Sequence, residues 1–113
     1  MKRADKLSGA IQAELAQLIS REVKDPRLPK GLITVIAVRL TPDLRRADVG
    51  VSLVGGGSPE EAVVVLTRLA GYLRGEVARR LNLRRAPELH FAIDRQAEAE
   101  ANIERLLRDE DDQ

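Results

Sequence analysis

Residues 32–54 read LITVIAVRLTPDLRRADVGVSLV, and this stretch decides the fold. Its first part, residues 32–40, is rich in β-branched side chains, which is typical of a strand. Residues 47–54 alternate apolar with polar or small side chains, as expected of a strand with one buried face. Between them lies TPDL at 41–44, whose proline and aspartate favour a turn. The stretch therefore predicts an antiparallel β-hairpin.

An amphipathic helix is predicted before this hairpin. From Asp5 to Val23, apolar residues recur at intervals of three and four, which places them on one side of a helix. Asp25-Pro26 ends the pattern, because the residue before a proline is disfavoured in a helix. The residues expected to face the core are Leu7, Ala10, Ile11, Leu15, Leu18 and Ile19.

A second helical pattern covers residues 59–81, after a glycine cluster at 55–57 and a predicted cap at Ser58. Gly71 and Gly75 lie inside it, where each costs up to about 1 kcal/mol relative to alanine. Such a helix is a candidate for a kink or for a close approach of its backbone to another group. From the residues alone, we expect the glycines to permit tight packing of the helix against the sheet.

The last third of the chain predicts a strand and a helix. Residues 87–94 alternate in the manner of a strand, and residues 97–108 have a helical pattern. Residues 109–113 are acidic and too few to fold, so we expect a disordered tail. The order of elements predicts one α+β domain over residues 1–108, with a three-stranded sheet and the helices packed on one face.

The composition excludes several classes of site. The 113 residues include no cysteine and one histidine, His90, which alternates with apolar neighbours and should face solvent. No serine has the context of a nucleophile, and the glycine cluster at 55–57 lacks the residues of a P-loop. We therefore expect no enzyme, no metal site and no cofactor. No stretch is apolar enough to span a membrane, so we expect a soluble, cytoplasmic protein.

Charge is distributed in blocks, although the net charge is only +1. Residues 1–46 hold ten Lys or Arg and five Asp or Glu, residues 66–90 hold six and two, and residues 91–113 hold three and eight. Two basic blocks folded onto one face would attract phosphate groups, whereas charges that only solvate helices would not. The chain has one Phe, one Tyr and no Trp, so few aromatic rings are available for stacking on bases.

Several motifs, in their order, resemble the bacterial ribosome-binding factor A family. They are EVKDPRL at 22–28, LITV at 32–35, TPDL at 41–44 with ADV at 47–49, AGYLR at 70–74, RRL at 79–81 and PELHF at 87–91. The resemblance covers about residues 3–108 and implies a KH-like fold of type II topology. It also implies that the long helix is two helices meeting at a kink. The family's kink usually reads Ala-x-Gly, and Leu69-Ala70-Gly71 matches it at the glycine.

The resemblance implies a function as well. Members of this family bind free 30S small ribosomal subunits, contact 16S rRNA, assist late maturation and processing of the 5′ end of that RNA, and are associated with cold adaptation. We expect binding as a monomer, through a basic face that recognises RNA by its shape and backbone. The expected contacts are Gly71 at the kink and the basic residues Arg3, Lys6, Lys24, Arg27, Arg45, Arg46, Arg74, Arg79, Arg80, Arg84 and Arg85.

Other interpretations stay open at this point. A protein–protein adaptor in ribosome assembly could use the acidic C-terminal segment to bind a basic partner. A nuclease is disfavoured, because the sequence offers no cluster of metal ligands. Any single arginine could be a solvated helix charge, and Arg39 and Arg68 are weaker candidates for RNA contact. Asp25 and Pro26 are expected to fix the exit of the first helix rather than to contact RNA.

Overall fold

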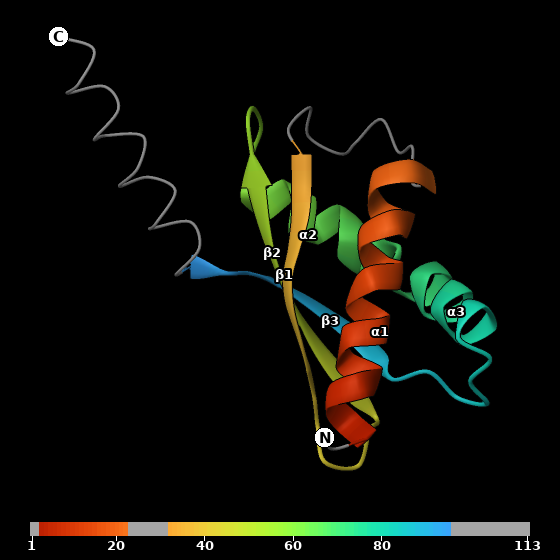
Figure 1. Cartoon of the computed structure of the whole chain (residues 1–113). Helices are drawn as coiled ribbons and strands as arrows, with labels where there is room; N and C mark the ends of the chain where they lie inside the picture. Colours follow the sequence, from red (N-terminus) through yellow and green to blue (C-terminus); the bar gives the residue numbers. More distant parts are fainter. Residues whose placement is uncertain (1–2, 23–31, 96–113) are drawn as a thin grey trace, which may run out of the picture.

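The computed structural model describes residues 3–22 and 32–95, and Figure 1 shows their arrangement. The predicted final helix at 97–108, the tail at 109–113 and the segment 24–31 lie outside these residues. Every element predicted within them is present. In chain order these are helix α1 (Arg3–Gln17), a turn of π-helix η1 (Leu18–Glu22), strands β1 (Leu32–Leu40) and β2 (Arg46–Val54), helices α2 (Pro59–Arg68) and α3 (Ala70–Arg80), and strand β3 (Glu88–Ile93).

The strands form one mixed sheet in the order β1-β2-β3. β1 and β2 pair antiparallel, with a shift in register between Val35 and Ala37. β2 and β3 pair parallel, with Arg46 opposite Glu88 at the start. A parallel pair cannot be joined by a tight turn and needs a long crossover. Here α2 and α3 form that crossover.

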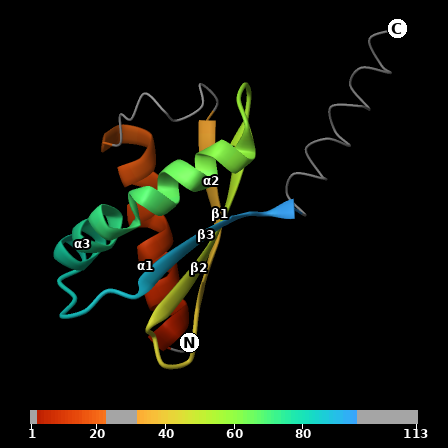
Figure 2. The ribbon, with the colours of Figure 1, turned by 180° about the vertical axis from the view of Figure 1, so that it is seen from behind.

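The core lies between the helices and one face of the sheet, as predicted. The apolar residues that alternate along β2 are buried together with those of α1, α2 and α3 in a single cluster. Figure 2, which turns the view of Figure 1 by 180°, shows α2 and α3 leading from the end of β2 to the start of β3. Several side chains that alternate with the buried ones are exposed on the opposite face, among them Arg39, Asp48 and His90.

Helices α2 and α3 meet at Leu69, so the single helix predicted from periodicity is two helices, as the resemblance implies. Leu69 has φ −88° and ψ −1°, and it both ends α2 and begins α3. Its N–H donates to the carbonyls of Val65 and Leu66 at 3.0 and 3.1 Å. Its carbonyl accepts from the Leu73 N–H at 2.9 Å, so hydrogen bonding continues through the kink.

The predicted cap of α2 is confirmed. Ser58 Oγ accepts a hydrogen bond from the Glu61 N–H at 3.3 Å, and Pro59 takes the first helical position. The first N–H groups of a helix have no partner within the helix. Pro59 has no N–H to leave unpaired, and the Ser58 hydroxyl accepts a hydrogen bond from one of the N–H groups after it. The serine hydroxyl donates in turn to Glu60 Oε2 at 3.2 Å.

The packing role expected for Gly71 and Gly75 is wrong. A Cβ placed on either residue would meet no neighbouring atom within 4 Å, and both glycines are exposed. Neither has a positive φ, so the backbone conformation does not require glycine either. Because the glycines face outward rather than toward the sheet, they leave the backbone of α3 uncovered on the outer surface.

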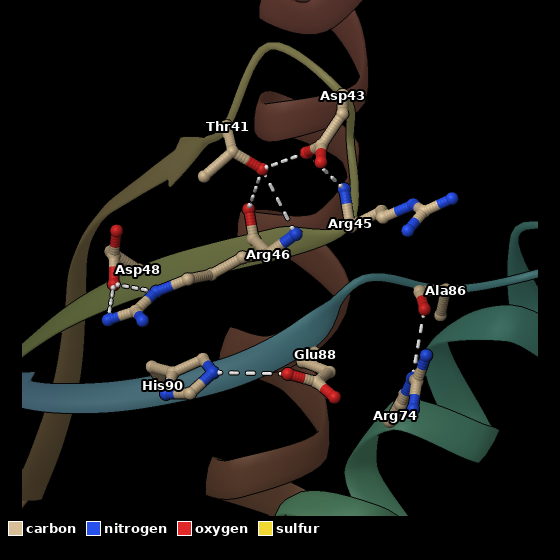
Figure 3. Close-up of polar contacts among 9 residues, drawn as sticks. All are labelled: Thr41, Asp43, Arg45, Arg46, Asp48, Arg74, Ala86, Glu88 and His90. Atoms are coloured by element: carbon tan, nitrogen blue, oxygen red, sulfur yellow. Dashed lines mark hydrogen bonds and ion pairs between the residues drawn. The ribbon is translucent and has the colours of Figure 1, made fainter.

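The turn between β1 and β2 is held by hydrogen bonds that Figure 3 shows. Thr41 Oγ1 donates to Asp43 Oδ1 at 2.6 Å and accepts from the Arg46 N–H at 3.1 Å. Asp43 Oδ1 also accepts from the Arg45 N–H at 3.1 Å. Leu44 has φ 61°, a left-handed conformation that residues other than glycine adopt only under constraint. These hydrogen bonds fix the backbone of Arg45 and Arg46, and so the positions from which their side chains project.

Leu69→Ala is expected to fold, because Leu69 lies at the edge of the core and alanine favours helices. The loss in free energy of unfolding should be about 1–2 kcal/mol, measured by urea denaturation. Leu73→Ala is the matched control in α3; it removes a side chain that is 0% exposed and should cost about 3 kcal/mol or more. An unfolded Leu69→Ala variant would show that the kink depends on this leucine.

The stability contributed by Asp43 should depend on pH. The Thr41 hydroxyl, and then the Arg45 N–H, lower the pKa of Asp43 from its ordinary value of 3.8. The folded protein thus favours the carboxylate, so this stability is present above pH 3.8 and is lost as the pH falls through the lower folded pKa. Asp43→Asn should be less stable than the wild type at neutral pH, with a difference that shrinks below pH 3.8 in urea unfolding. A difference independent of pH would contradict this.

Candidate nucleic-acid interface

Three segments far apart in the sequence lie at one end of the molecule. They are the first turn of α1, the turn at 41–45 and the loop at 81–87 that precedes β3 (Figures 1 and 2). Parts of the two basic blocks of the sequence, residues 1–46 and 66–90, therefore meet there. We call this region the basic end. We define it by the basic residues of the three segments, Arg3, Lys6, Arg45, Arg84 and Arg85, together with Arg46 and Arg74, which line a hollow beside them.

Hydrogen bonds fasten the hairpin turn and the loop to the elements beside them. The Glu88 N–H donates to the Arg45 carbonyl at 2.8 Å, which joins the hairpin turn to the start of β3. Arg74 Nε donates to the Ala86 carbonyl at 2.9 Å, which joins α3 to the loop (Figure 3). Ala86 and Pro87 are buried behind these contacts. The arginines at this end therefore project from a fixed backbone.

A depression of about 530 Å³ opens between the hairpin turn, α3 and the loop. Residues from both basic blocks line it, which no local sequence pattern could establish. We call it the arginine depression; its charged lining residues are Arg45, Arg46, Arg74 and Arg85, with the carboxylates Asp43 and Glu88.

Two of the predicted arginines are paired inside the molecule. Arg79 Nη2 lies 2.6 Å from Glu76 Oε2, and Arg80 lies 3.6 Å from the same oxygen and 3.5 Å from Glu14 of α1. The hydrogen bond from Arg79 is the main cause that lowers the pKa of Glu76, so this carboxylate stays charged. Of these pairs, Arg80–Glu14 connects α3 to α1. Contact of Arg79 and Arg80 with RNA stays a prediction.

Arg46 has an intramolecular partner as well. Its Nε and Nη2 lie 3.0 and 2.9 Å from Asp48 Oδ1, and both side chains are about half exposed. Figure 3 shows the Arg46 guanidinium directed along β2 to Asp48, away from Arg45. The two neighbouring arginines of the hairpin therefore point in different directions.

Bare backbone adjoins this region along α3. Gly71 and Gly75 flank Arg74 in sequence, and no neighbouring side chain covers either glycine. Tyr72, 51% exposed, is the one aromatic residue with an exposed ring, because Phe91 is buried in the core. The region thus offers guanidinium groups and uncovered helix backbone rather than aromatic faces.

The other predicted residues are placed as follows. Arg84 is exposed and precedes Arg85 in the loop. Lys24 and Arg27 lie outside residues 3–22 and 32–95. Arg39 is exposed on the open face of the sheet and Arg68 at the end of α2, and neither lines the arginine depression.

Two parts of this region were missed by sequence reasoning. The first is the left-handed conformation of Leu44, which sets the direction of the backbone at Arg45. Glycine or asparagine would have indicated such a conformation in the sequence, but this position is a leucine. The Ala86 carbonyl that binds Arg74 did have a signal, because the residue before Pro87 is held in an extended conformation. That signal indicates that Ala86 is not helical, but it does not identify the arginine that binds its carbonyl.

Within residues 3–22 and 32–95, no group of three or more His, Cys, Asp and Glu is placed to hold a metal ion. His90 is half exposed on the open face, as predicted, with its Nε2 3.5 Å from Glu88 Oε2. None of the helices in this part of the chain has the length and apolar character to cross a membrane.

The sequence matches the family model described as ribosome-binding factor A over residues 3–107. Ribosome-binding factor A of Marinobacter nauticus is 40% identical over 114 residues, covering 95% of this chain and 78% of that protein. The protein of the same name from Acetivibrio thermocellus is 42% identical over 112 residues, covering 96% and 89%.

Solved structures of this family have the same fold. The crystal structure of ribosome-binding factor A from Thermus thermophilus superposes with a TM-score of 0.72 at 35% identity, covering 81% of this chain and 96% of that chain. A homology model of the Thermus thermophilus factor, fitted into a cryo-EM map of its complex with the 30S subunit, gives 0.59 at 33% identity, covering 80% and 89%.

The family model, the relatives at about 40% identity and the shared KH-like α+β fold agree with one another. Each covers most of the chain, and the KH-like fold is the one that the sequence resemblance implies. The chain belongs to the ribosome-binding factor A family, whose members are non-enzymatic factors of ribosome assembly.

Proposed function

We propose that this chain binds free 30S subunits and assists their late maturation, including processing of the 5′ end of 16S rRNA. The observation that carries the proposal is the meeting of two basic sequence blocks at the basic end. It is supported by the Thermus thermophilus factor, which has been fitted into a map of its 30S complex. By this proposal the chain acts in the cytoplasm as a monomer, without a cofactor, and contributes to growth in the cold.

The proposed mode of binding is through the RNA backbone. Exposed arginines bind phosphate by charge and by the planar fork of the guanidinium. Tyr72 alone offers an exposed ring, so stacking on bases contributes little. Folded RNA presents phosphates and 2′-hydroxyl groups, which a rigid basic surface can recognise by shape. Bound in this way, the protein holds an immature RNA conformation until a later factor releases it.

We assign the RNA contacts first to the basic end and to the bare backbone at Gly71. Arg79 and Arg80 rank second, because contact with phosphate must compete with Glu76 and Glu14. Lys24 and Arg27 are retained as predicted contacts from the sequence.

Binding to purified 30S subunits should weaken steeply with salt, because each phosphate that is neutralised releases counterions. With about four phosphates bound, the logarithm of the association constant should fall with a slope of about −3 against the logarithm of salt concentration. Cosedimentation over a series of salt concentrations measures this slope. Fully assembled ribosomes should not carry the chain into the pellet, and cells with a basic-end variant should accumulate 16S rRNA with an unprocessed 5′ end.

A matched variant tests the adaptor alternative. Replacing the acidic residues 109–112 by their amides should leave 30S binding unchanged or slightly stronger, because RNA repels carboxylates. Loss of binding in that variant would favour an adaptor that binds a protein of the subunit. An affinity of the wild type that does not change with salt would contradict binding through phosphate.

Gly71→Ala and Gly75→Ala should separate stability from binding. Each should raise the free energy of unfolding by about 0.5–1 kcal/mol, because the added methyl group meets no atom and alanine favours a helix. Each should nevertheless weaken 30S binding, because the methyl group keeps RNA away from the backbone. Gly9→Ala in α1 is the control: its Cβ also meets no atom, and it should stabilise without weakening binding. Unchanged binding of the α3 variants would remove Gly71 from the interface.

A further inference from the structure

We propose that the arginine depression is a phosphate-binding site that takes one backbone phosphate of RNA. The proposal rests on the proposed function and adds to it a defined position for one phosphate. It requires three conditions: a guanidinium held in place, further cations with no ion-pair partner, and carboxylates that are bound elsewhere.

Arg74 meets the first condition. Its Nε donates to the Ala86 carbonyl at 2.9 Å, and its side chain is partly buried. A guanidinium has five N–H donors, so this bond leaves the four on the two Nη atoms for a ligand. Because the side chain is already held, little conformational entropy is lost when those donors bind an oxyanion.

Arg45 and Arg85 meet the second condition. Both are exposed, and they line the depression from the hairpin turn and from the loop before β3. Figure 3 shows the Arg45 side chain extending from the turn on the side where Arg74 and Ala86 lie. In the described residues, neither Arg45 nor Arg85 has an ion-pair partner within 4 Å, although the charge of Arg45 contributes to lowering the pKa of Asp43. Like charges around one hollow repel one another, and an oxyanion between them would remove that repulsion.

The carboxylates of the depression meet the third condition. Asp43 Oδ1 accepts from the Thr41 hydroxyl and from the Arg45 N–H, so it is committed to the turn. Glu88 Oε2 lies 3.5 Å from His90 Nε2, which directs this carboxylate toward the open face of the sheet (Figure 3). The phosphate would therefore face guanidinium groups rather than carboxylates.

A second hollow, on the open face of the sheet, provides the contrast. Its lining carries Arg39, Arg46 and Arg95 together with Asp48 and Asp94, a formal charge of +1, whereas four arginines and two carboxylates give the arginine depression +2. Arg46 is paired with Asp48 there, so this hollow should attract a phosphate less strongly than the arginine depression. Arg39 and Arg95 are exposed arginines outside the arginine depression, and Arg95 Nη2 lies 3.8 Å from Glu60 Oε1. They serve as the control for the loss of two positive charges.

The first test is a titration of the whole chain with inorganic phosphate at constant ionic strength, followed by NMR of backbone amides and arginine Nε–H groups. The expected result is a saturable shift confined to Arg45, Arg74, Arg85 and the Glu88 amide. Arg85→Lys keeps the charge but loses the fork, and should reduce this shift. Shifts spread over all exposed arginines would overturn the proposal, because they indicate diffuse attraction.

The second test measures the salt dependence of 30S binding. Arg45→Ala/Arg85→Ala should make the slope shallower by about one and weaken binding about tenfold at 0.1 M salt, as expected when one phosphate contact is lost. Arg39→Ala/Arg95→Ala removes the same charge and should change the slope by clearly less. Thermal unfolding of each variant shows that the fold is intact.

The outcomes separate this proposal from the proposed function. If wild type binds 30S subunits but the two double variants behave alike, the phosphate site is wrong and the function stands. If inorganic phosphate saturates the depression but the Arg45/Arg85 variant keeps the wild-type slope, the site binds a free anion and the RNA assignment is wrong. If wild type does not bind 30S subunits, the proposed function fails, and with it the RNA assignment.

Discussion

The parallel pairing of β3 with β2 is the constraint on which the rest of the structure depends. It requires a crossover of more than thirty residues, from Val54 to Glu88, and α2 and α3 bury the sheet as they make it. The crossover returns the chain to the start of β2, where the Glu88 N–H binds the Arg45 carbonyl. The second basic block is thereby brought to the first. An antiparallel β3 would begin at the other end of β2 and would leave the two blocks apart.

Local physics made most of the fold predictable. The turn at 41–45, the cap at Ser58 and the alternation of β2 depend on residues close in sequence, and all three are present. The kink at Leu69 was not predictable from periodicity, because a single residue with ψ near 0° hardly disturbs the spacing of apolar side chains. The direction of Gly71 was misjudged although periodicity indicates it: at about 100° per residue, Gly71 lies on the side of the helix away from the buried Leu73 and Val77.

The site was less predictable, because the sequence shows charges but not their partners. Arg74 binds the carbonyl of Ala86, 12 residues away in the sequence. Arg80 in α3 lies 3.5 Å from Glu14 in α1. Arg45 and Arg46 are neighbours, yet one extends from the turn and the other pairs with Asp48. An arginine that is paired inside the protein must exchange one carboxylate for a phosphate, and it gains less from RNA than an unpaired arginine does.

The small net charge of +1 bears on how such a factor recognises RNA. Sequence-independent affinity for nucleic acid grows with the number of phosphates that a protein can neutralise. A strongly cationic chain would therefore bind any RNA in the cell and dissociate slowly from all of it. Here the acidic residues at 91–113 offset the basic blocks in total charge, while the fold concentrates cations at one end. Attraction falls off within about 8 Å at physiological salt, so that local arrangement, rather than the total charge, determines which RNA is bound.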